Sequence, residues 1–294
     1  MTDLWHQLRK EHIGGSDIAC LFGEGYVSRY RLWNEKKGII APTNLDADER
    51  VQAGKFLEAG VIAWANHRWN MHFYQPKMYV KHPRIKGMAC TPDAFSSGFD
   101  DVSSPTERIA QIKCVDNIQF REWEVSGEII THAPLHIELQ CQHEMACTGA
   151  QENWLIVCVG GNKLFRKVIQ RDEDVIQIIE REVTEFWKSI EDNVPPVPDY
   201  VNDGDIIRDI RKKLNVIERV DLSDDNSLYD TIELLKKHIA SRKVASDAET
   251  FIKNEIIHLY GEYGFIKCRD NFLTVKPDIN GHIRVLIGTE KVTI

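Results

Sequence analysis

A change of hydrophobic period near residue 70 limits the fold of this chain more than any other feature. Residues 46–70 follow a helical pattern that turns Val51, Ile62 and Ala65 toward a core. The stretches that follow, HFYQPKMYVKH, KGMACTPDAF and ERIAQIKCVD, are short and typical of strands. A chain that passes from helical to strand periodicity in this way predicts an α/β class of fold, a mixed α+β sheet flanked by helices.

Helices and strands alternate in the next part of the chain as well. Residues 117–127 are typical of a short helix, and residues 135–149 of a longer one that ends at a glycine. Residues 153–172 predict a hairpin. Residues 174–193 predict an amphipathic helix with an apolar stripe of Val175, Ile178, Ile179, Val183 and Trp187.

The proline-rich stretch VPPVPD, residues 194–199, separates two parts of different composition. After it the chain is charged and helical, with few aromatic residues, and it ends in short strands around a turn at Asn280 and Gly281. We therefore expect a first domain over residues 1–199. Residues 200–294 are expected to form a helical appendage with short terminal strands.

Composition excludes some classes of protein and leaves others open. The chain has 294 residues, a net charge of −8 and seven cysteines, none of them in a C-x-x-C pair. This cysteine pattern argues against a zinc or iron–sulfur site and favours reduced thiols in the cytoplasm. No apolar run approaches the ~18 residues of a membrane helix, and the polar N-terminus predicts no signal peptide. The negative charge argues against basic patches for nonspecific nucleic-acid binding, but it permits a basic channel.

The stretch ERIAQIKCVD carries the most informative polar residues. As a strand, it has on one face Glu107, Ile109, Gln111 and Lys113. With Asp93 on a neighbouring candidate strand, Gln111 and Lys113 can share a pocket, and Glu58 on the preceding helix can add a carboxylate. Such a set suits metal-dependent phosphodiester cleavage, because Mg²⁺ prefers oxygen ligands and a lysine offsets phosphate charge. Alone the spacing is a weak signal, since Asp93 also suits a turn and Lys113 a solvated strand edge.

Several motifs occur together in an order that is more specific. They are GGSDIACLFG, GKFLEAG, TPDAF, QIKC, IELQCQHEMACTG, VGG and FWKSIEDNVPPVPD. Over roughly residues 9–199, this series resembles the YqaJ-like viral recombinases and the lambda-exonuclease family. The resemblance implies a restriction-endonuclease-like core of the PD-(D/E)xK type.

The resemblance also implies roles for individual residues. Asp93 is similar to the family's metal-binding aspartate, and Lys113 to the motif lysine. Gln111 stands where the family has a glutamate, and Ile112 would offer its backbone carbonyl to the metal. Glu58 resembles the helix carboxylate beside the active centre. The implied cofactor is magnesium, with manganese as a substitute.

Three further residues receive roles from the resemblance. Gln140 is similar to a glutamine on the helix that follows the core strands, near DNA or the site. Arg9 and Ser16 resemble a pair that receives the terminal 5′-phosphate of DNA. An arginine beside helix N-terminal amides is a sound anion site. The alternative is that Ser16 only caps a helix, with Asp17 in its first turn, and that Arg9 is solvated.

The glutamine at position 111 leaves two hypotheses open. An amide oxygen can coordinate magnesium but adds no charge. Gln111 is therefore either a native variant, similar to the Gln-x-Lys of Mrr-type restriction enzymes, or a substitution that disables cleavage and keeps DNA binding. We favour the native variant.

The resemblance implies a 5′→3′ exonuclease on double-stranded DNA ends, acting in phage or prophage recombination inside a bacterial host cell. A single-strand annealing protein is the implied partner, a ring-shaped homotrimer is the implied assembly, and no membrane is involved. Two alternatives remain. One is a DNA-end-binding protein with little or no cleavage, and the other is a restriction-type endonuclease of the same fold.

Overall fold

The computed structural model describes residues 3–42, 48–76, 78–96, 107–214, 220–269, 271–277 and 283–289. The chain forms two compact units, Met1–Asn215 and Val216–Ile294. Within the described stretches, no helix is both long enough and apolar enough to cross a bilayer.

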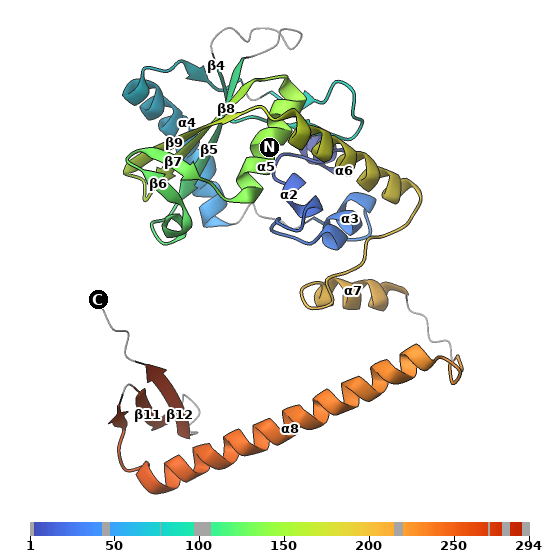
Figure 1. Cartoon of the computed structure of the whole chain (residues 1–294), viewed down its shortest axis with the longest axis vertical. Coiled ribbons are helices and arrows are strands. Elements are labelled where there is room, and N and C mark those ends of the chain that lie inside the picture. Colours follow the sequence, from blue (N-terminus) through green and yellow to red (C-terminus); the bar gives the residue numbers. More distant parts are fainter. Residues whose placement is uncertain are drawn as a thin grey trace. The chain divides into compact units, whose positions relative to one another are not determined.

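A mixed sheet of seven strands forms the core of the first unit, in the spatial order β1-β4-β5-β8-β9-β7-β6 (Figure 1). The strands are Phe73–Tyr74 (β1), Ala94–Ser96 (β4), Arg108–Val115 (β5), Glu124–Ser126 (β6), Ile129–His132 (β7), Glu152–Val159 (β8) and Lys163–Gln170 (β9). The pairs β5–β8 and β7–β9 are parallel, and the other neighbouring pairs are antiparallel. The predicted fold class is therefore confirmed, and β8 and β9 form the predicted hairpin.

Helices cover both faces of this sheet. Helix α4 (Glu49–Trp69) packs on one face, where its buried Ile62 and Ala65 share a cluster with Ala110 and Ile112 of β5. Helices α5 (Leu135–Thr148) and α6 (Glu173–Glu191) contact each other on the opposite face, where Ile109 of β5 is buried. The two faces of β5 follow from strand geometry, because successive side chains point in opposite directions.

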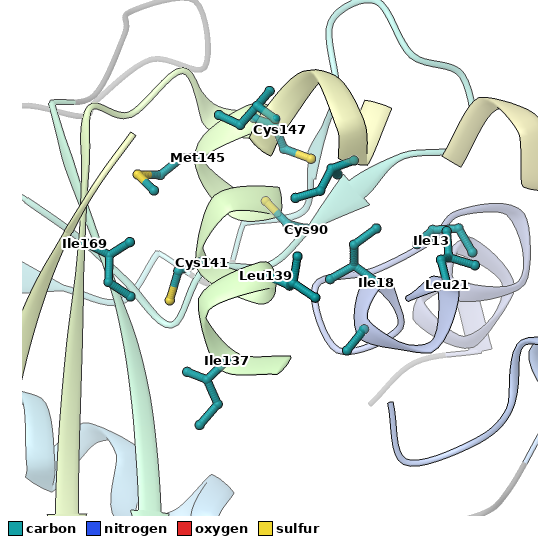
Figure 2. Close-up of a cluster of buried hydrophobic side chains, with 14 of the residues drawn as sticks. Ile13, Ile18, Leu21, Cys90, Ile137, Leu139, Cys141, Met145, Cys147 and Ile169 are labelled. Carbon is teal, nitrogen blue, oxygen red and sulfur yellow. The ribbon is translucent and has the colours of Figure 1, made fainter. Parts of the chain in front are cut away.

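The core on the α5 side contains several thiols (Figure 2). Cys141 and Cys147 of α5 are buried there, whereas Cys114 on the other face is only half-buried. Cys90 belongs to a separate two-stranded sheet of Val80–Lys81 (β2) and Ala89–Cys90 (β3).

Three short helices precede α4: Asp3–Glu11 (α1), Ile18–Leu21 (α2) and Arg29–Lys37 (α3). Ser28 caps α3, since its Oγ accepts a hydrogen bond from the Arg31 amide at 2.9 Å. The alternative prediction, that Ser16 caps a helix, was wrong: Asp17, not Ser16, occupies the N-cap position of α2, and no side chain caps this helix. The Asp17 side chain does not cap the helix because its carboxylate is held by other partners, which are described below.

Two other predictions differ from the structure in detail. On α6 the buried residues are Ile176, Ile179, Val183, Phe186 and Ile190. Ile178 is 41% exposed, so the buried stripe is rotated relative to the predicted one. The predicted short helix over residues 117–127 is a single 3-10 turn, Gln119–Glu122, which is followed by strand β6.

Helix α7 (Gly204–Leu214) belongs to the first compact unit, which ends at Asn215, whereas the sequence placed a boundary after residue 199. Two polar contacts hold the start of this helix against α3. Ser28 Oγ donates to Asp203 Oδ1 at 2.5 Å, and Arg31 Nη1 donates to Asp205 Oδ2 at 3.1 Å.

The second unit consists of one long helix and a small sheet. Helix α8 is Asn226–Tyr260, and the antiparallel strands are Phe265–Cys268 (β10), Asn271–Pro277 (β11) and Ile283–Thr289 (β12). The predicted turn at Asn280 and Gly281 lies outside the described residues.

Candidate active site

Strand β5 brings Gln111 and Lys113 to the sheet face that α5 covers. Gln111 is buried, and Lys113 is half-buried one step further along the same face. Strand β4 pairs with β5 in a register that sets Ala94 opposite Ala110. Asp93, which comes immediately before β4, therefore lies beside the middle of β5.

Asp93 is bound directly to β5. Its Oδ2 accepts a hydrogen bond of 2.7 Å from the Ile112 amide and a second hydrogen bond from Gln111 Nε2. Burial raises the pKa of the Asp93 carboxyl to about 6, although the Ile112 amide, the Lys113 ammonium and the Gln111 amide all favour the ionised form. The sequence prediction that Asp93, Gln111 and Lys113 share a pocket agrees with this geometry; their catalytic roles remain proposals.

Gln140 of α5 joins Lys113 to Gln111. Lys113 Nζ donates to Gln140 Oε1 at 2.9 Å, and Gln140 Nε2 donates to Gln111 Oε1 at 2.8 Å. An ammonium group can only donate, so the Gln140 oxygen must face Lys113 and its nitrogen must face Gln111. The same logic fixes the next amide: Gln111 presents its oxygen to Gln140 and its nitrogen to Asp93.

Glu144 is a site residue that the sequence reasoning missed. It lies one helical turn after Gln140 and is only 1% exposed. Gln140 Nε2 donates to Glu144 Oε1 at 2.8 Å, and Asn153 Nδ2 of β8 donates to Glu144 Oε2 at 3.0 Å. Burial, and after it the negative charge of Asp93, raises the pKa of Glu144 to about 8. The i,i+4 spacing from Gln140 was the available signal, because it sets both side chains on one side of a helix.

Glu58 lies on α4, the helix that covers the other face of the sheet. Its carboxylate accepts a hydrogen bond from Gln75 Nε2. Burial, Cys158, Glu58 and Asp93 together raise the pKa of the Cys114 thiol to about 11, so both carboxylates lie near this thiol. Glu58 thus lies on the α4 side of the sheet with Gln75 as its hydrogen-bond partner, and its role beside the active centre remains a proposal.

The oxygens around Asp93 suit a hard divalent cation such as Mg²⁺. They are the Asp93 carboxylate, the Ile112 carbonyl and the side-chain oxygen of Gln111. In the present arrangement Gln111 Nε2 donates both to Asp93 Oδ2 and to the Ile112 carbonyl, the latter at 3.3 Å. The donor set therefore fits a cation once the Gln111 amide is turned to present Oε1. Across the described residues, no group of three or more His, Cys, Asp or Glu side chains is arranged to hold a metal.

The structure also brings Arg9 and Ser16 together. Arg9 Nη2 donates to Ser16 Oγ at 3.4 Å and to Asp17 Oδ1 at 3.2 Å, and the Arg9 side chain is 42% exposed. Lys36 Nζ donates to Asp17 Oδ2 at 2.7 Å. Burial alone would raise the pKa of Asp17, but Lys36 and Arg9 hold it below its usual value. Among the described side chains, Arg9 and Lys36 are thus the cations gathered around the Asp17 carboxylate, and a guanidinium beside a hydroxyl suits a phosphate.

The loop that carries Ser16 packs against α5. A Cβ atom added to Gly15 would lie 3.0 Å from Glu144 Oε1 and 3.1 Å from Gln140 Cγ. Only glycine fits this close approach without displacing a neighbour. Gly15, the neighbour of Ser16, therefore lies against Gln140, the residue that binds both Lys113 and Gln111.

Comparisons with known proteins agree with this fold. The YqaJ-like viral recombinase domain model matches residues 4–151, half of the chain. The protein YqaJ of Bacillus subtilis (strain 168) is 26% identical over 271 residues, which cover 90% of this chain and 80% of that protein. The crystal structure of the alkaline exonuclease LHK-Exo from Laribacter hongkongensis matches with a TM-score of 0.53 and 22% identity, over 66% of this chain and 94% of that one. A second crystal structure, LHK-Exo in complex with dAMP, matches to the same extent. The exonuclease match shows a shared fold, and the domain match shows that this chain belongs to the YqaJ-like viral recombinase family.

Proposed function

We propose that this chain is a metal-dependent deoxyribonuclease, an exonuclease that degrades one strand of double-stranded DNA from a 5′ end during phage or prophage recombination. The observation that carries the proposal is the hydrogen-bonded chain from Lys113 through Gln140 and Gln111 to Asp93. Membership of a recombinase family and a fold shared with an alkaline exonuclease support it. A single-strand annealing protein as partner, a homotrimer and the bacterial cytoplasm belong to the same proposal.

Each residue of the chain has a task in this proposal. Asp93, the Ile112 carbonyl and a turned Gln111 amide would hold Mg²⁺, with Glu58 as a further carboxylate from α4. The bound ion would supply charge neutralisation and a more acidic water. Lys113, held by Gln140, directs its ammonium at the attacking water and offsets charge on the phosphate. The Arg9/Ser16 cluster receives the terminal 5′-phosphate.

A second candidate function rests on one specific observation. Gln111 Nε2 occupies the position between Asp93 and the Ile112 carbonyl that a cation would need. If this amide never turns, the protein binds DNA ends and barely cleaves. A restriction-type endonuclease of the same fold is the other alternative.

Three measurements separate these functions: nucleotide release from linear 5′-phosphorylated duplex with added Mg²⁺, cutting of a closed circular duplex with added Mg²⁺, and binding of the linear duplex without metal. The proposal predicts release from the linear duplex only. Cutting of the circle would identify an endonuclease, and metal-independent binding without release would identify an end-binding protein.

Two site variants with matched controls test the assignment of residues. Lys113→Ala and Asp93→Asn should each lower release by about 100-fold or more, since each removes a charge at the reacting centre. The exposed residues Lys163 and Asp174 supply the controls Lys163→Ala and Asp174→Asn, which should leave the rate unchanged. Retention of more than about a tenth of the activity in either site variant would show that the site is misplaced.

A further inference from the structure

The Gln140 amide is held from three sides. Its oxygen accepts from Lys113 at 2.9 Å, and its nitrogen donates to Gln111 and to Glu144, each at 2.8 Å. A reversed amide would set its nitrogen against an ammonium group and its oxygen against the oxygens of Gln111 and Glu144. Lys113 and Glu144 therefore select the same orientation of Gln140 from opposite ends.

Glu144 is itself anchored in a way that ordinary packing does not require. A buried carboxyl is costly unless its oxygens are hydrogen-bonded. Here Asn153 Nδ2 reaches it from β8, and Gly15 approaches it closely from the N-terminal loop. An apolar side chain of the same size would fill this space without the cost, so the acceptor oxygen has a function beyond volume.

A proton on Glu144 leaves its contact with Gln140 in place. Within the described part of the chain, Asn153 Oδ1 is buried and has no hydrogen-bond partner. If the Asn153 amide turns, giving up its long contact of 3.4 Å with the Cys141 carbonyl, this oxygen can accept a hydrogen bond from a protonated Glu144 Oε2. Glu144 Oε1 then still accepts from Gln140 in either protonation state.

We propose that Glu144 is a positioning residue: its Oε1 fixes the Gln140 amide, and through Gln140 it holds the Lys113 ammonium and the orientation of the Gln111 amide. The proposal rests on the proposed function of Asp93, Gln111 and Lys113. Glu144 touches neither substrate nor metal. Its effect on the reaction passes entirely through Gln140.

The test compares two neutral replacements of similar size. Glu144→Gln keeps an oxygen for Gln140 and a nitrogen for the turned Asn153, whereas Glu144→Met keeps neither. A role in positioning predicts that the Glu144→Gln protein releases nucleotides at the wild-type rate and that the Glu144→Met protein does not. A role in packing predicts the opposite order, because Met is the better core residue.

Three measurements distinguish these outcomes. In metal-free protein, Glu144→Met should move the side-chain amide NMR signals of Gln111, while those of Gln142, which is bound to Gln170 and Asp172, stay in place. Mn²⁺ alone, titrated without DNA, should bind Glu144→Met about fivefold more tightly than Glu144→Gln. The reason is that the Gln111 amide turns more easily when Gln140 is no longer fixed, and about fivefold corresponds to the net free energy of one hydrogen bond. The kcat for nucleotide release should fall by tens of fold, up to about 100-fold, in Glu144→Met with KM little changed, because Lys113 is misplaced.

The same comparison in a Gln140→Ala background isolates the path. There the Met and Gln variants should have equal Mn²⁺ dissociation constants and equal kcat. Glu138→Met, on the same helix but paired with Lys167, is the matched control and should resemble the wild type. If Glu144→Met does not fold, Glu144→Leu replaces it.

The positioning role would be overturned if Glu144→Met and Glu144→Gln had equal kcat and equal Mn²⁺ dissociation constants, or if the Gln111 amide signals did not move. It would also be overturned if the two variants still differed in the Gln140→Ala background. A wild-type protein that releases no nucleotides, yet shows the predicted NMR and Mn²⁺ differences, would contradict the proposed nuclease function and leave the positioning role intact.

Discussion

Gln111 donates its side-chain amide to Asp93, the residue with which a metal-binding glutamate would be expected to share a cation. The direction of this hydrogen bond is set two residues from Gln111 in the network, by the Lys113 ammonium, which can only donate to Gln140. The amide therefore balances the buried Asp93 carboxylate in the absence of a cation. A cation at this position must compete with that hydrogen bond, which makes Gln111 the residue that decides how readily metal binds.

Glu144→Gln should change how the stability of the protein depends on pH. Because the pKa of Glu144 is raised from 4.5 to about 8 in the folded state, its favourable contribution is complete below about pH 4.5 and is lost as the pH rises through 8. In the presence of a chelator, the melting temperature of the wild type should fall relative to that of Glu144→Gln between about pH 5 and pH 9. Parallel curves for the two proteins would contradict the raised pKa.

Arg9→Ala should reduce the preference for 5′-phosphorylated ends. The reason is that the Arg9 guanidinium, which is partly exposed beside Ser16, can donate hydrogen bonds to an incoming phosphate. Rates on phosphorylated and hydroxyl-ended duplex should approach each other in this variant. The exposed neighbour Lys10 supplies the control Lys10→Ala, which should keep the wild-type ratio. If the ratio of the two rates were unchanged in Arg9→Ala, Arg9 would have only a structural role as the ion-pair partner of Asp17.

Lys36→Met should destabilise the first unit. Lys36 Nζ holds Asp17 at 2.7 Å and the backbone carbonyls of Arg9 and His12 at 2.6 and 2.8 Å, and its side chain is only 7% exposed. Removing one partner of a buried pair leaves an uncompensated charge, with a cost of about 3 kcal/mol.

Urea denaturation of Lys36→Met measures that cost. The double variant Lys36→Met with Asp17→Asn should recover part of the loss, because it removes the buried charge as well. Additive losses in the double variant would mean that the ion pair is not what stabilises this loop.

Those features that depend on neighbours in the sequence were predictable. Ser28 caps α3 and Gly38 ends it in the left-handed conformation, and both residue types are those that local capping rules favour at these positions. The alternation of β5 was enough to set Gln111 and Lys113 on one face. Ser16 was misassigned because the long-range partners Arg9 and Lys36 hold the Asp17 carboxylate, which a local capping rule does not include.

Features decided by distant contacts were not predictable in the same way. The apolar residues of α6 fit the helical period in more than one rotation, and packing against α5 and α2 selects the stripe that contains Ile176 and Phe186. Glu144 resembles a solvated helix residue until Asn153 of β8 and Gly15 of the N-terminal loop are brought against it. The orientation of the Gln111 amide is likewise a property of the assembled network.

The most direct test of the account is a magnesium titration of nucleotide release from linear 5′-phosphorylated duplex by the wild type, Gln111→Glu and Gln111→Ala. A carboxylate at position 111 adds charge beside the cation and cannot donate to Asp93, so half-maximal magnesium should fall in Gln111→Glu. Turnover at saturating magnesium should stay within roughly tenfold of the wild type, because Lys113 and Gln140 are unchanged. Gln111→Ala should be the weakest of the three, since it lacks the oxygen ligand. A nearly inert wild type beside a Gln111→Glu protein on the order of a thousandfold faster would contradict the account and identify an end-binding protein that has lost its cleavage site.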